Sequence, residues 1–317
     1  MTLVLILMVD QERFPTTYET TELQDLRKQN LSTRQFLQDN GFSFLHHYAG
    51  STACCPSRTT LYTGQYPSLH GVTQTNGVAK HTYDADVFWL DPNSVPTIGD
   101  YFRTAGYHTF WKGRWHASAT DIRIPGTTSG LSSYDRLGYP DPEEESFYYY
   151  SDRLENYGFS GWIGPEPHGS SPRNSGSSAA IGLRGRDEIH ATQTVNLLMQ
   201  LDQHSDTHPW LFMCSFVNPH DIALYGQLSA RIPLYDFQID PTLPRIPPPP
   251  TAVEDLYTKP SAQASYRSVY QEALQPTRDT EHLRKLYFSL QKQVDHEMGT
   301  AHFFLSGYIC HLYNGSW

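Results

Sequence analysis

The strongest constraint on the fold is an uninterrupted apolar segment near the amino terminus, residues 3–9. A continuous apolar run without polar alternation is typical of a parallel strand that is buried on both faces. The segment is too short to span a bilayer, and it lacks the basic flank and the small-residue cleavage site of a signal peptide. The sequence therefore predicts an α/β fold with a largely parallel sheet flanked by helices, and a cytoplasmic location.

Length and composition indicate how many domains the chain can form and which kinds of partner they argue against. The 317 residues can hold one large α/β domain or two smaller ones. A net charge of −10 and the lack of a basic stripe argue against a nucleic-acid-binding protein. Four cysteines, at positions 54, 55, 214 and 310, are too few and too scattered for a disulfide framework. We therefore expect neither a nucleic-acid partner nor a membrane partner.

Periodicity and composition divide the rest of the chain. Apolar residues at helical spacing predict helices over residues 21–38, 187–201 and 281–304, and short apolar runs predict strands at 109–111 and 210–216. Residues 117–186 are rich in Ser, Gly, Tyr and Pro, and we expect an elaborated loop region over the site that contains the substrate pocket. The acidic run within that region is expected to be a solvated face, and residues 241–260 to be a proline-rich loop.

The strongest functional signal is the stretch CCPSR at residues 54–58, which continues to a Thr-Gly pair at 63–64. Proline suits the first turn of a helix, and the residues after it predict a short helix with residue 54 at its positive end. That end of a helix favours an anionic nucleophile and an anionic substrate. Arg58, one turn along, can reach back toward an oxyanion with a fork of donors. Taken without its flanks, the stretch would fit a buried cysteine pair beside a loop arginine.

This stretch resembles the signature of the type I sulfatases, which belong to the alkaline-phosphatase-like superfamily. In that family the cysteine with proline two residues on and arginine four residues on is oxidised to formylglycine by a formylglycine-generating enzyme. Only Cys54, and not Cys55, has that spacing here. The resemblance implies a small-molecule sulfate ester as substrate. It also implies a hydrated aldehyde at residue 54, whose two hydroxyls split one hard displacement into attack and release.

Asp10 and Gln11 directly follow the first predicted strand, at the edge of an open α/β sheet where ligands gather. Two neighbouring oxygen-bearing side chains suit a hard divalent cation such as Ca²⁺ or Mg²⁺, although a turn cap explains the pair taken alone. Many sulfatases carry Asp-Asp here, whereas Asp-Gln is more typical of choline sulfatases and phosphonate monoester hydrolases. The resemblance implies a divalent cation held by Asp10, Gln11 and residue 54.

Residues 113–116 follow another predicted strand and resemble the sulfatase block Gly-Lys-Trp-His. His116 matches the family histidine that contacts a nucleophile hydroxyl. Arg114 stands where the family usually has a lysine that touches a sulfate oxygen. Arginine is bulkier than lysine and binds an oxyanion with a different geometry, so the exchange is not neutral. Lys112, two residues earlier, is an alternative source of the positive charge that contacts the sulfate.

Two further residues complete the predicted site. His220 follows the strand at 210–216, and the resemblance places it against the sulfate or the leaving-group oxygen, a role that suits a pKa near neutrality. Asn76 falls near the place where related enzymes bind substrate with an asparagine, although Asn-Gly is also an ordinary turn signal. The predicted assignments are Cys54, Arg58 and His116 as catalytic residues, Arg114, His220 and Asn76 as substrate-binding residues, and Asp10, Gln11 and Cys54 as metal ligands.

The resemblance covers nearly the whole chain but only the first two thirds or so of the family's length. Relatives continue into a second metal pair, a sulfate-binding lysine and a smaller C-terminal subdomain, which the sequence after residue 304 does not match. Asp295 lies inside the helix expected at 281–304, and we predict a helix residue there rather than a ligand. Residues 1–317 are therefore expected to form one sulfatase N-terminal catalytic domain that is incomplete at its C-terminal end.

The sequence thus predicts metal-assisted hydrolysis of a sulfate ester. Hydrolysis of a phosphonate monoester or a phosphodiester with the same residues is the nearest alternative, because the Asp-Gln pair fits both. A catalytically inactive sulfatase-like fragment is a second alternative, because the late metal pair is missing. An unrelated cysteine hydrolase is a third, and alkylation of Cys54 would inactivate only that enzyme.

Overall fold

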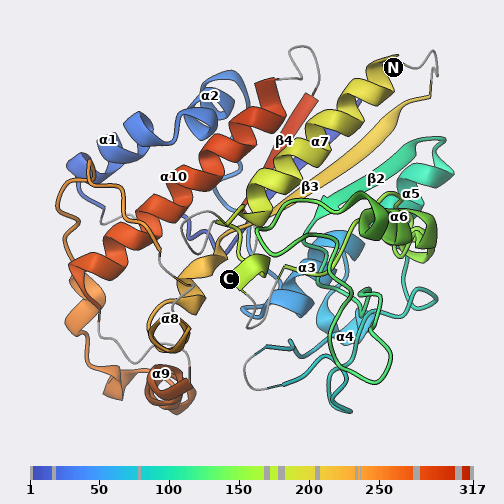
Figure 1. Ribbon diagram of the computed structural model, residues 1–317. Helices are drawn as coiled ribbons and strands as arrows, with labels where there is room; N and C mark the ends of the chain where they lie inside the picture. The colour runs from blue at the N-terminus through green and yellow to red at the C-terminus, as the bar shows by residue number, and fades with distance from the viewer. Residues whose placement is uncertain are drawn as a thin grey trace.

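A parallel sheet forms the centre of the protein. The computed structural model describes residues 3–15, 19–77, 80–167, 172–177, 183–203, 208–232, 235, 237–273, 279–303 and 309–314. Within these ranges, four strands pair in the order β2-β3-β1-β4, all parallel (Figure 1). Their bounds are β1 Val4–Asp10, β2 His108–Gly113, β3 Trp210–Pro219 and β4 Ile309–Asn314. The prediction of an α/β fold with a parallel sheet flanked by helices is confirmed.

Alternate residues of β1 and β3 face two different layers, as the two-residue period of a strand requires. The helices α7 (Arg186–Gln203) and α10 (Glu281–Phe303) cover one face of the sheet in Figure 1, within two residues of the predicted bounds. Burial of each large apolar side chain in this layer stabilises the fold by about 1.5–3 kcal/mol. The buried members are Leu5, Leu7, Val9, Ala191, Leu198, Trp210, Phe212, Cys214, Phe216, Val294, Met298 and Ala301.

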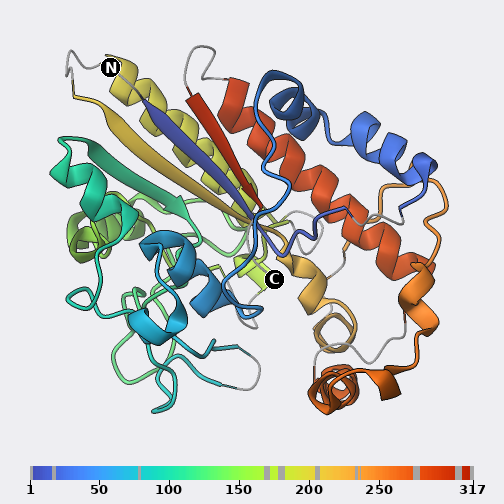
Figure 2. The same cartoon turned by 180° about the vertical axis from the view of Figure 1, so that it is seen from behind.

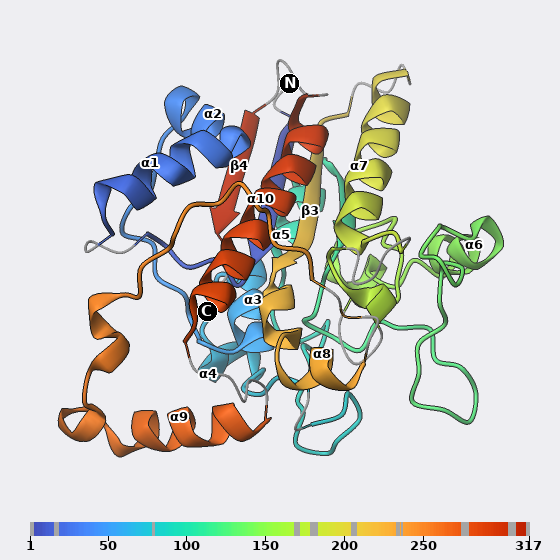
Figure 3. The same ribbon diagram turned by 60° about the vertical axis from the view of Figure 1, so that its left-hand side comes forward.

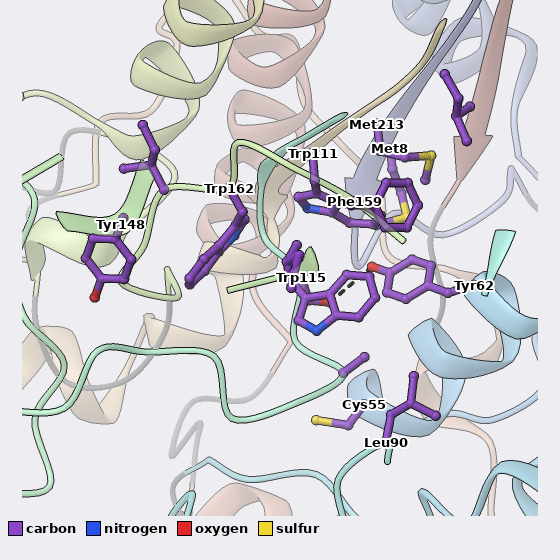
Figure 4. Close-up of a cluster of buried hydrophobic side chains, with 14 of the residues drawn as sticks. Met8, Cys55, Tyr62, Leu90, Trp111, Trp115, Tyr148, Phe159, Trp162 and Met213 are labelled. Atoms are coloured by element: carbon purple, nitrogen blue, oxygen red, sulfur yellow. Dashed lines mark hydrogen bonds between the residues drawn. The ribbon is translucent and has the colours of Figure 1, made fainter. Parts of the chain in front are cut away.

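Aromatic side chains dominate the opposite layer (Figure 4). Tyr62 stacks on Trp115 with ring centroids 4.7 Å apart, and Trp111 meets Trp115 edge-on at 4.9 Å. Phe159 packs edge-on against Trp111 at 5.0 Å. Aromatic pairs in these geometries add about 0.5–1.5 kcal/mol each to the effect of burial. This cluster fixes the segment that follows β2 against the helix that carries Tyr62.

The helix expected over residues 21–38 is interrupted, so that prediction is wrong in its continuity. The chain forms α1 (Thr21–Asn30) and α2 (Ser32–Asn40) instead. The Asp295 carboxylate accepts from the N–H groups of Thr33 (2.9 Å) and Arg34 (3.1 Å) in the first turn of α2, and it also pairs with the Arg34 guanidinium. A carboxylate at this position accepts hydrogen bonds from otherwise free N–H groups, and its negative charge interacts favourably with the helix dipole. The prediction that Asp295 is a residue of the long helix is confirmed.

The carboxyl ends of the strands point toward α3 (Cys54–Thr63), the helix predicted from the CCPSR stretch (Figure 2). This helix ends at Gly64, which adopts a left-handed conformation with φ of 67°. A short helix before β2, α5 (Ile98–Thr104), begins with a capping box at Thr97. Side chains that follow β1, β2 and β3 therefore lie near the start of α3.

The region 117–186 contains a helix that we did not predict, α6 (Pro142–Ser151). The acidic run, expected to be only a solvated face, forms its first turn, and Asp141 caps it by accepting from two N–H groups.

Figure 3 shows α8 and α9 beyond the carboxyl ends of the strands. The other elements are α4 Pro67–His70, α8 Gln227–Arg231, α9 Ser261–Ala273, and the 3-10 turns Glu155–Tyr157, Pro172–Asn174, His220–Leu224, Pro250–Val253 and Leu256–Thr258. None of the helices over described residues is long and apolar enough to cross a membrane.

Candidate active site

Asp10 ends β1 and lies buried among positive charges. Its Oδ2 accepts from Nη2 of Arg58 (2.9 Å) and pairs with Nη1 of Arg114. Burial raises the pKa of this carboxyl, but Arg114, Arg58 and His220 outweigh burial and lower the pKa to about 2. Oδ1 is buried and has no hydrogen-bond partner in the described part of the chain. Asp10 is therefore an ionised carboxylate with one oxygen still able to bind a cation.

Cys54 is the first residue of α3, as the motif predicted. Its sulfur lies within 4.8 Å of an oxygen of Asp10 and a ring nitrogen of His220. A helix N-terminus usually lowers a thiol pKa. Here burial, followed by the negative charge of Asp10, raises the pKa of Cys54. An unmodified Cys54 is therefore a neutral thiol at neutral pH, which argues against the unrelated cysteine hydrolase.

Arg58 is buried and held at several points one turn further along α3. Besides the bond to Asp10, its Nη1 donates to the hydroxyl of Tyr62 (2.8 Å), the carbonyl of Arg114 (2.8 Å) and the hydroxyl of Ser215 (3.1 Å). These partners come from α3, from the segment after β2 and from β3. Arg58 thus connects the three segments that build the site, and these contacts fix the orientation of its guanidinium group.

His116 lies in a chain of hydrogen bonds that determines its tautomer. Nη2 of Arg114 is 2.8 Å from Nδ1 of His116, and Nε2 of His116 is 2.5 Å from Oδ1 of Asn76. Arginine can only donate, so Nδ1 is the acceptor and Nε2 carries the proton that is donated to Asn76. Nδ2 of Asn76 donates in turn to Thr82 (2.9 Å). Asn76, which we predicted to bind substrate, therefore orients His116.

A buried carboxylic acid that no sequence motif predicts holds the backbone of His116. His116 has a φ of 54°, which is unusual for a side chain with a Cβ. Its N–H donates to Oε1 of Glu166 (2.7 Å), and the N–H of Glu166 donates to Oδ1 of Asp121 (2.7 Å). Burial raises the pKa of Glu166 to about 7 and that of Asp121 to about 6. No local motif marks either residue, because the contact joins positions fifty residues apart.

His220 and Gln11 both lie beside the end of β1. Pro219 is the register partner of Asp10, which places His220, the first residue of a 3-10 turn, beside the end of β1. His220, predicted as a substrate contact, is thus grouped with Asp10 and Cys54 as a possible metal ligand. Gln11 adopts a left-handed conformation with φ of 62°, and its carbonyl accepts from the hydroxyl of Tyr287 (2.9 Å).

Lys112 does not replace Arg114 in the site. Its ammonium is buried and donates to the carbonyl of Gly161 (2.6 Å), and burial lowers its pKa to about 8. The alternative that the Lys112 ammonium supplies the positive charge of the site is therefore wrong, since Arg114 contacts Asp10 and His116 directly. The structure gathers these predicted residues at the strand ends: Asp10, Cys54, Arg58, Asn76, Arg114, His116 and His220.

Comparison with known proteins gives a consistent family. The family model described as Sulfatase matches residues 2–300. The chain is 34% identical over 96 residues to the uncharacterised sulfatase YidJ of Escherichia coli, which is 30% of this chain and 16% of that protein. It is 30% identical over 83 residues to N-acetylglucosamine-6-sulfatase of Homo sapiens, which is 26% of this chain and 15% of that protein. The matched segments thus span only a small part of these relatives.

Solved structures share the fold at low sequence identity. The structure of BT1596, a 2-O GAG sulfatase, matches 96% of this chain and 54% of its own, with a TM-score of 0.51 and 16% identity. The phosphonate monoester hydrolase SpPMH of Silicibacter pomeroyi matches 96% and 59%, with a TM-score of 0.50 and 21% identity. This chain therefore spans less than two thirds of either solved chain, and the likeness identifies the fold.

Proposed function

The chain belongs to the sulfatase family, and we propose that it hydrolyses a sulfate ester with residue 54, as formylglycine, acting as nucleophile. The observation that carries this proposal is the gathering of Asp10, Arg58, Arg114 and His116 around the N-terminus of α3. The raised pKa of Cys54 supports it, because a neutral thiol is a weak nucleophile, whereas a hydrated aldehyde requires no thiolate. A formylglycine-generating enzyme is then the partner needed for maturation.

The proposed roles follow from the contacts. Arg58, joined to three segments, keeps residue 54 and Asp10 in register. Arg114 supplies positive charge next to the nucleophile, where negative charge develops on the sulfate oxygens. His116, with its proton on Nε2, is held beside Arg114 by the bond that it donates to Asn76. Asn76 is in this scheme a positioning residue.

The residues present fit a divalent cation. Among the described residues, Oδ1 of Asp10 is buried without a hydrogen-bond partner, and ligand atoms of Asp10, Cys54 and His220 lie within 4.8 Å of one another. After conversion, residue 54 would offer a hydroxyl oxygen in place of sulfur, and the Gln11 amide would add another oxygen donor. Ca²⁺ and Mg²⁺ both prefer such oxygen ligands. When bound, the cation would act as a Lewis acid on an oxygen of the sulfate.

Hydrolysis of a phosphonate monoester is the second candidate reaction. A phosphonate monoester, like a sulfate monoester, presents a single negative charge on a tetrahedral centre, so the same two arginines suit both. The Asp10-Gln11 pair at the end of β1 favours keeping this candidate, because it departs from the Asp-Asp pair of many sulfatases. A panel of nitrophenyl sulfate, nitrophenyl phenylphosphonate and bis-nitrophenyl phosphate separates the reactions.

The test is hydrolysis of nitrophenyl sulfate by the 317-residue chain, produced together with a formylglycine-generating enzyme. Mass spectrometry first establishes the conversion of Cys54. We expect turnover that a chelator reduces and that Cys54→Ala lowers by at least about 10³-fold. Cys55→Ser is the matched control. Cys55 is the buried neighbour of Cys54, its thiol contacts Thr75, and it lacks the motif spacing for conversion to formylglycine. A folded, converted chain that hydrolyses no member of the panel would refute the proposal and support the inactive sulfatase-like fragment.

A further inference from the structure

A cavity of about 510 Å³ opens among the loops that follow His116. Its volume falls in the range of about 300–1,000 Å³ that is typical of small-molecule sites. The wall comes from residues after β2, from α6 and from one aromatic residue near Asn76. The lining residues are Tyr83, Ala119, Asp121, Ile122, Arg123, Phe147, Ser151 and Arg153.

Two routes tie this cavity to the candidate active site. Ala119 follows His116 by three residues, so their Cα atoms are within about 11 Å of each other. Asp121 accepts from the N–H of Glu166, whose carboxyl accepts from the N–H of His116. On the other side, Tyr83 directly follows Thr82, which accepts from the amide of Asn76. The cavity therefore lies two hydrogen bonds from the backbone of His116 through Glu166, and one residue along the chain from the partner of Asn76.

The charge of the lining is unusual for an acidic protein. Arg123 and Arg153 project into the lining, while Asp121, its one carboxylate, is turned to the backbone of Glu166. Nε of Arg123 donates to the carbonyl of Thr127 (2.7 Å), and Nε of Arg153 donates to the carbonyl of Thr120 (2.9 Å). In the part of the chain that the structure describes, neither guanidinium lies within ion-pair distance of a carboxylate, although the charge of Arg153 acts on Asp121 and opposes the rise in pKa that burial causes there. Their terminal nitrogens remain able to bind an anion.

Aromatic faces lie beside these cations. Arg123 stacks over the ring of Tyr83 with 4.2 Å between Cζ and the ring centroid, which fixes the plane of the guanidinium. The side chain of Phe147, on α6, is 54% exposed where it lines the cavity. An exposed aromatic side chain beside two arginines suits a ring that carries a negative charge.

We propose that this cavity binds the alcohol part of the substrate and selects a sulfate ester whose ring carries a second anionic group, a carboxylate or a further sulfate. The inference rests on the proposed function, because the cavity is read as the leaving-group side of that site. Arg123 and Arg153 bind the second anion, and Phe147 packs against the ring. The first sulfate, held near Arg114, is then separated from the second charge by the body of the ring.

A matched pair of substrates tests the inference: the sulfate esters of 4-hydroxybenzoate and of 4-hydroxybenzamide, which have the same shape and differ by one charge. We expect kcat/KM for the carboxylate to exceed that for the amide by about tenfold, since partly exposed charge pairs are individually weak. The double variant Arg123→Gln/Arg153→Gln should bring this ratio close to one, and Arg123→Lys/Arg153→Lys should restore most of it. Arg245→Gln, an exposed arginine beside α1, should leave the ratio unchanged.

Binding measured without turnover separates this inference from the proposed function. Calorimetric titration of the Cys54→Ala protein with 4-hydroxybenzoate and 4-hydroxybenzamide reports the cavity even if no sulfate is hydrolysed. Tighter binding of the benzoate that the double Gln variant abolishes supports the inference. Equal binding of the two compounds, or no binding of either in the millimolar range, overturns it. A selectivity ratio that survives the double variant overturns it as well.

Discussion

The buried acid behind His116 makes the stability of the protein depend on pH in a way that one substitution can isolate. Glu166 is 4% exposed, and burial raises its pKa to about 7 from 4.5 in the unfolded chain. The folded state therefore holds a proton that the unfolded state has released between these two pH values. By linkage, the free energy of unfolding falls as pH rises from about 4.5 to about 7. Below that window the two states hold the proton equally.

The magnitude follows from the two pKa values. Their difference of about 2.5 corresponds to at most about 3 kcal/mol, because one pKa unit is equivalent to about 1.4 kcal/mol. Glu166→Gln removes the titration and keeps an oxygen that can accept from the N–H of His116. The new amide group would occupy the place of Oε2, which is buried and has no hydrogen-bond partner among the residues that the structure describes. The variant therefore also carries a cost that does not change with pH.

Urea unfolding followed by tryptophan fluorescence, at several pH values from 4.5 to 8, is the assay. We expect the wild-type protein to lose up to about 3 kcal/mol more than Glu166→Gln between pH 4.5 and 7, with no further divergence above pH 8. The slope difference is the diagnostic quantity, since the fixed cost of the amide cancels in it. Parallel pH profiles for the two proteins would refute the assignment of Glu166 as a buried, proton-holding acid.

Three further outcomes are expected. Asp295→Asn should lower the free energy of unfolding by about 3 kcal/mol in urea titrations, at the low end for a broken buried ion pair because Arg34 keeps its pairing with Glu12. Gly113→Ala should cost about 2 kcal/mol or more by the same assay, because Gly113 has a φ of 84° and a Cβ there would meet a backbone carbonyl. Calorimetric titration with Ca²⁺ should give a dissociation constant no tighter than about 10⁻⁴ M, because the charge of Asp10 is already shared by two guanidinium groups.

Matched variants control for these effects. Asp39→Asn on the exposed surface of α2 should change stability by no more than about 0.5 kcal/mol, as expected for a surface position. Gly77→Ala should be nearly neutral, because its Cβ would meet no atom of the described part of the chain within 4 Å. Losses as large as those of the test variants would contradict the stated causes. Binding of Ca²⁺ with a dissociation constant clearly below about 10⁻⁴ M would contradict the charge argument.

The elements that depend on nearby residues were predictable from the sequence. The apolar run that became β1 and the CCPSR stretch that became α3 carry their signals within ten residues. Residues directly after strands were also placed correctly near one another, because parallel strands end at one edge of the sheet. Asp10, Arg114 and His116 meet there for that reason.

Features that depend on distant contacts were not predictable in this way. The break between α1 and α2 is stabilised by Asp295, which lies more than 250 residues away along the chain. Glu166 reaches His116 across a region without a recognisable motif. The helix α6 did carry a local signal, an Asp-Pro-Glu start, but the surrounding Ser, Gly and Tyr residues favoured a loop.

On the proposed function, Arg114 would couple the binding of the substrate to the binding of the cation. One carboxylate, Asp10, lies between two guanidinium groups, so these three side chains leave a net positive charge. A divalent cation enters against this charge, whereas a sulfate monoester, with one negative charge, neutralises it. Each ligand should therefore strengthen the binding of the other, and linkage makes the factor the same in both directions. Calorimetric titration with Ca²⁺ in the presence of inorganic sulfate should then give a tighter dissociation constant than in chloride of equal ionic strength, and an unchanged value would show that Arg114 and Arg58 do not control access of the cation.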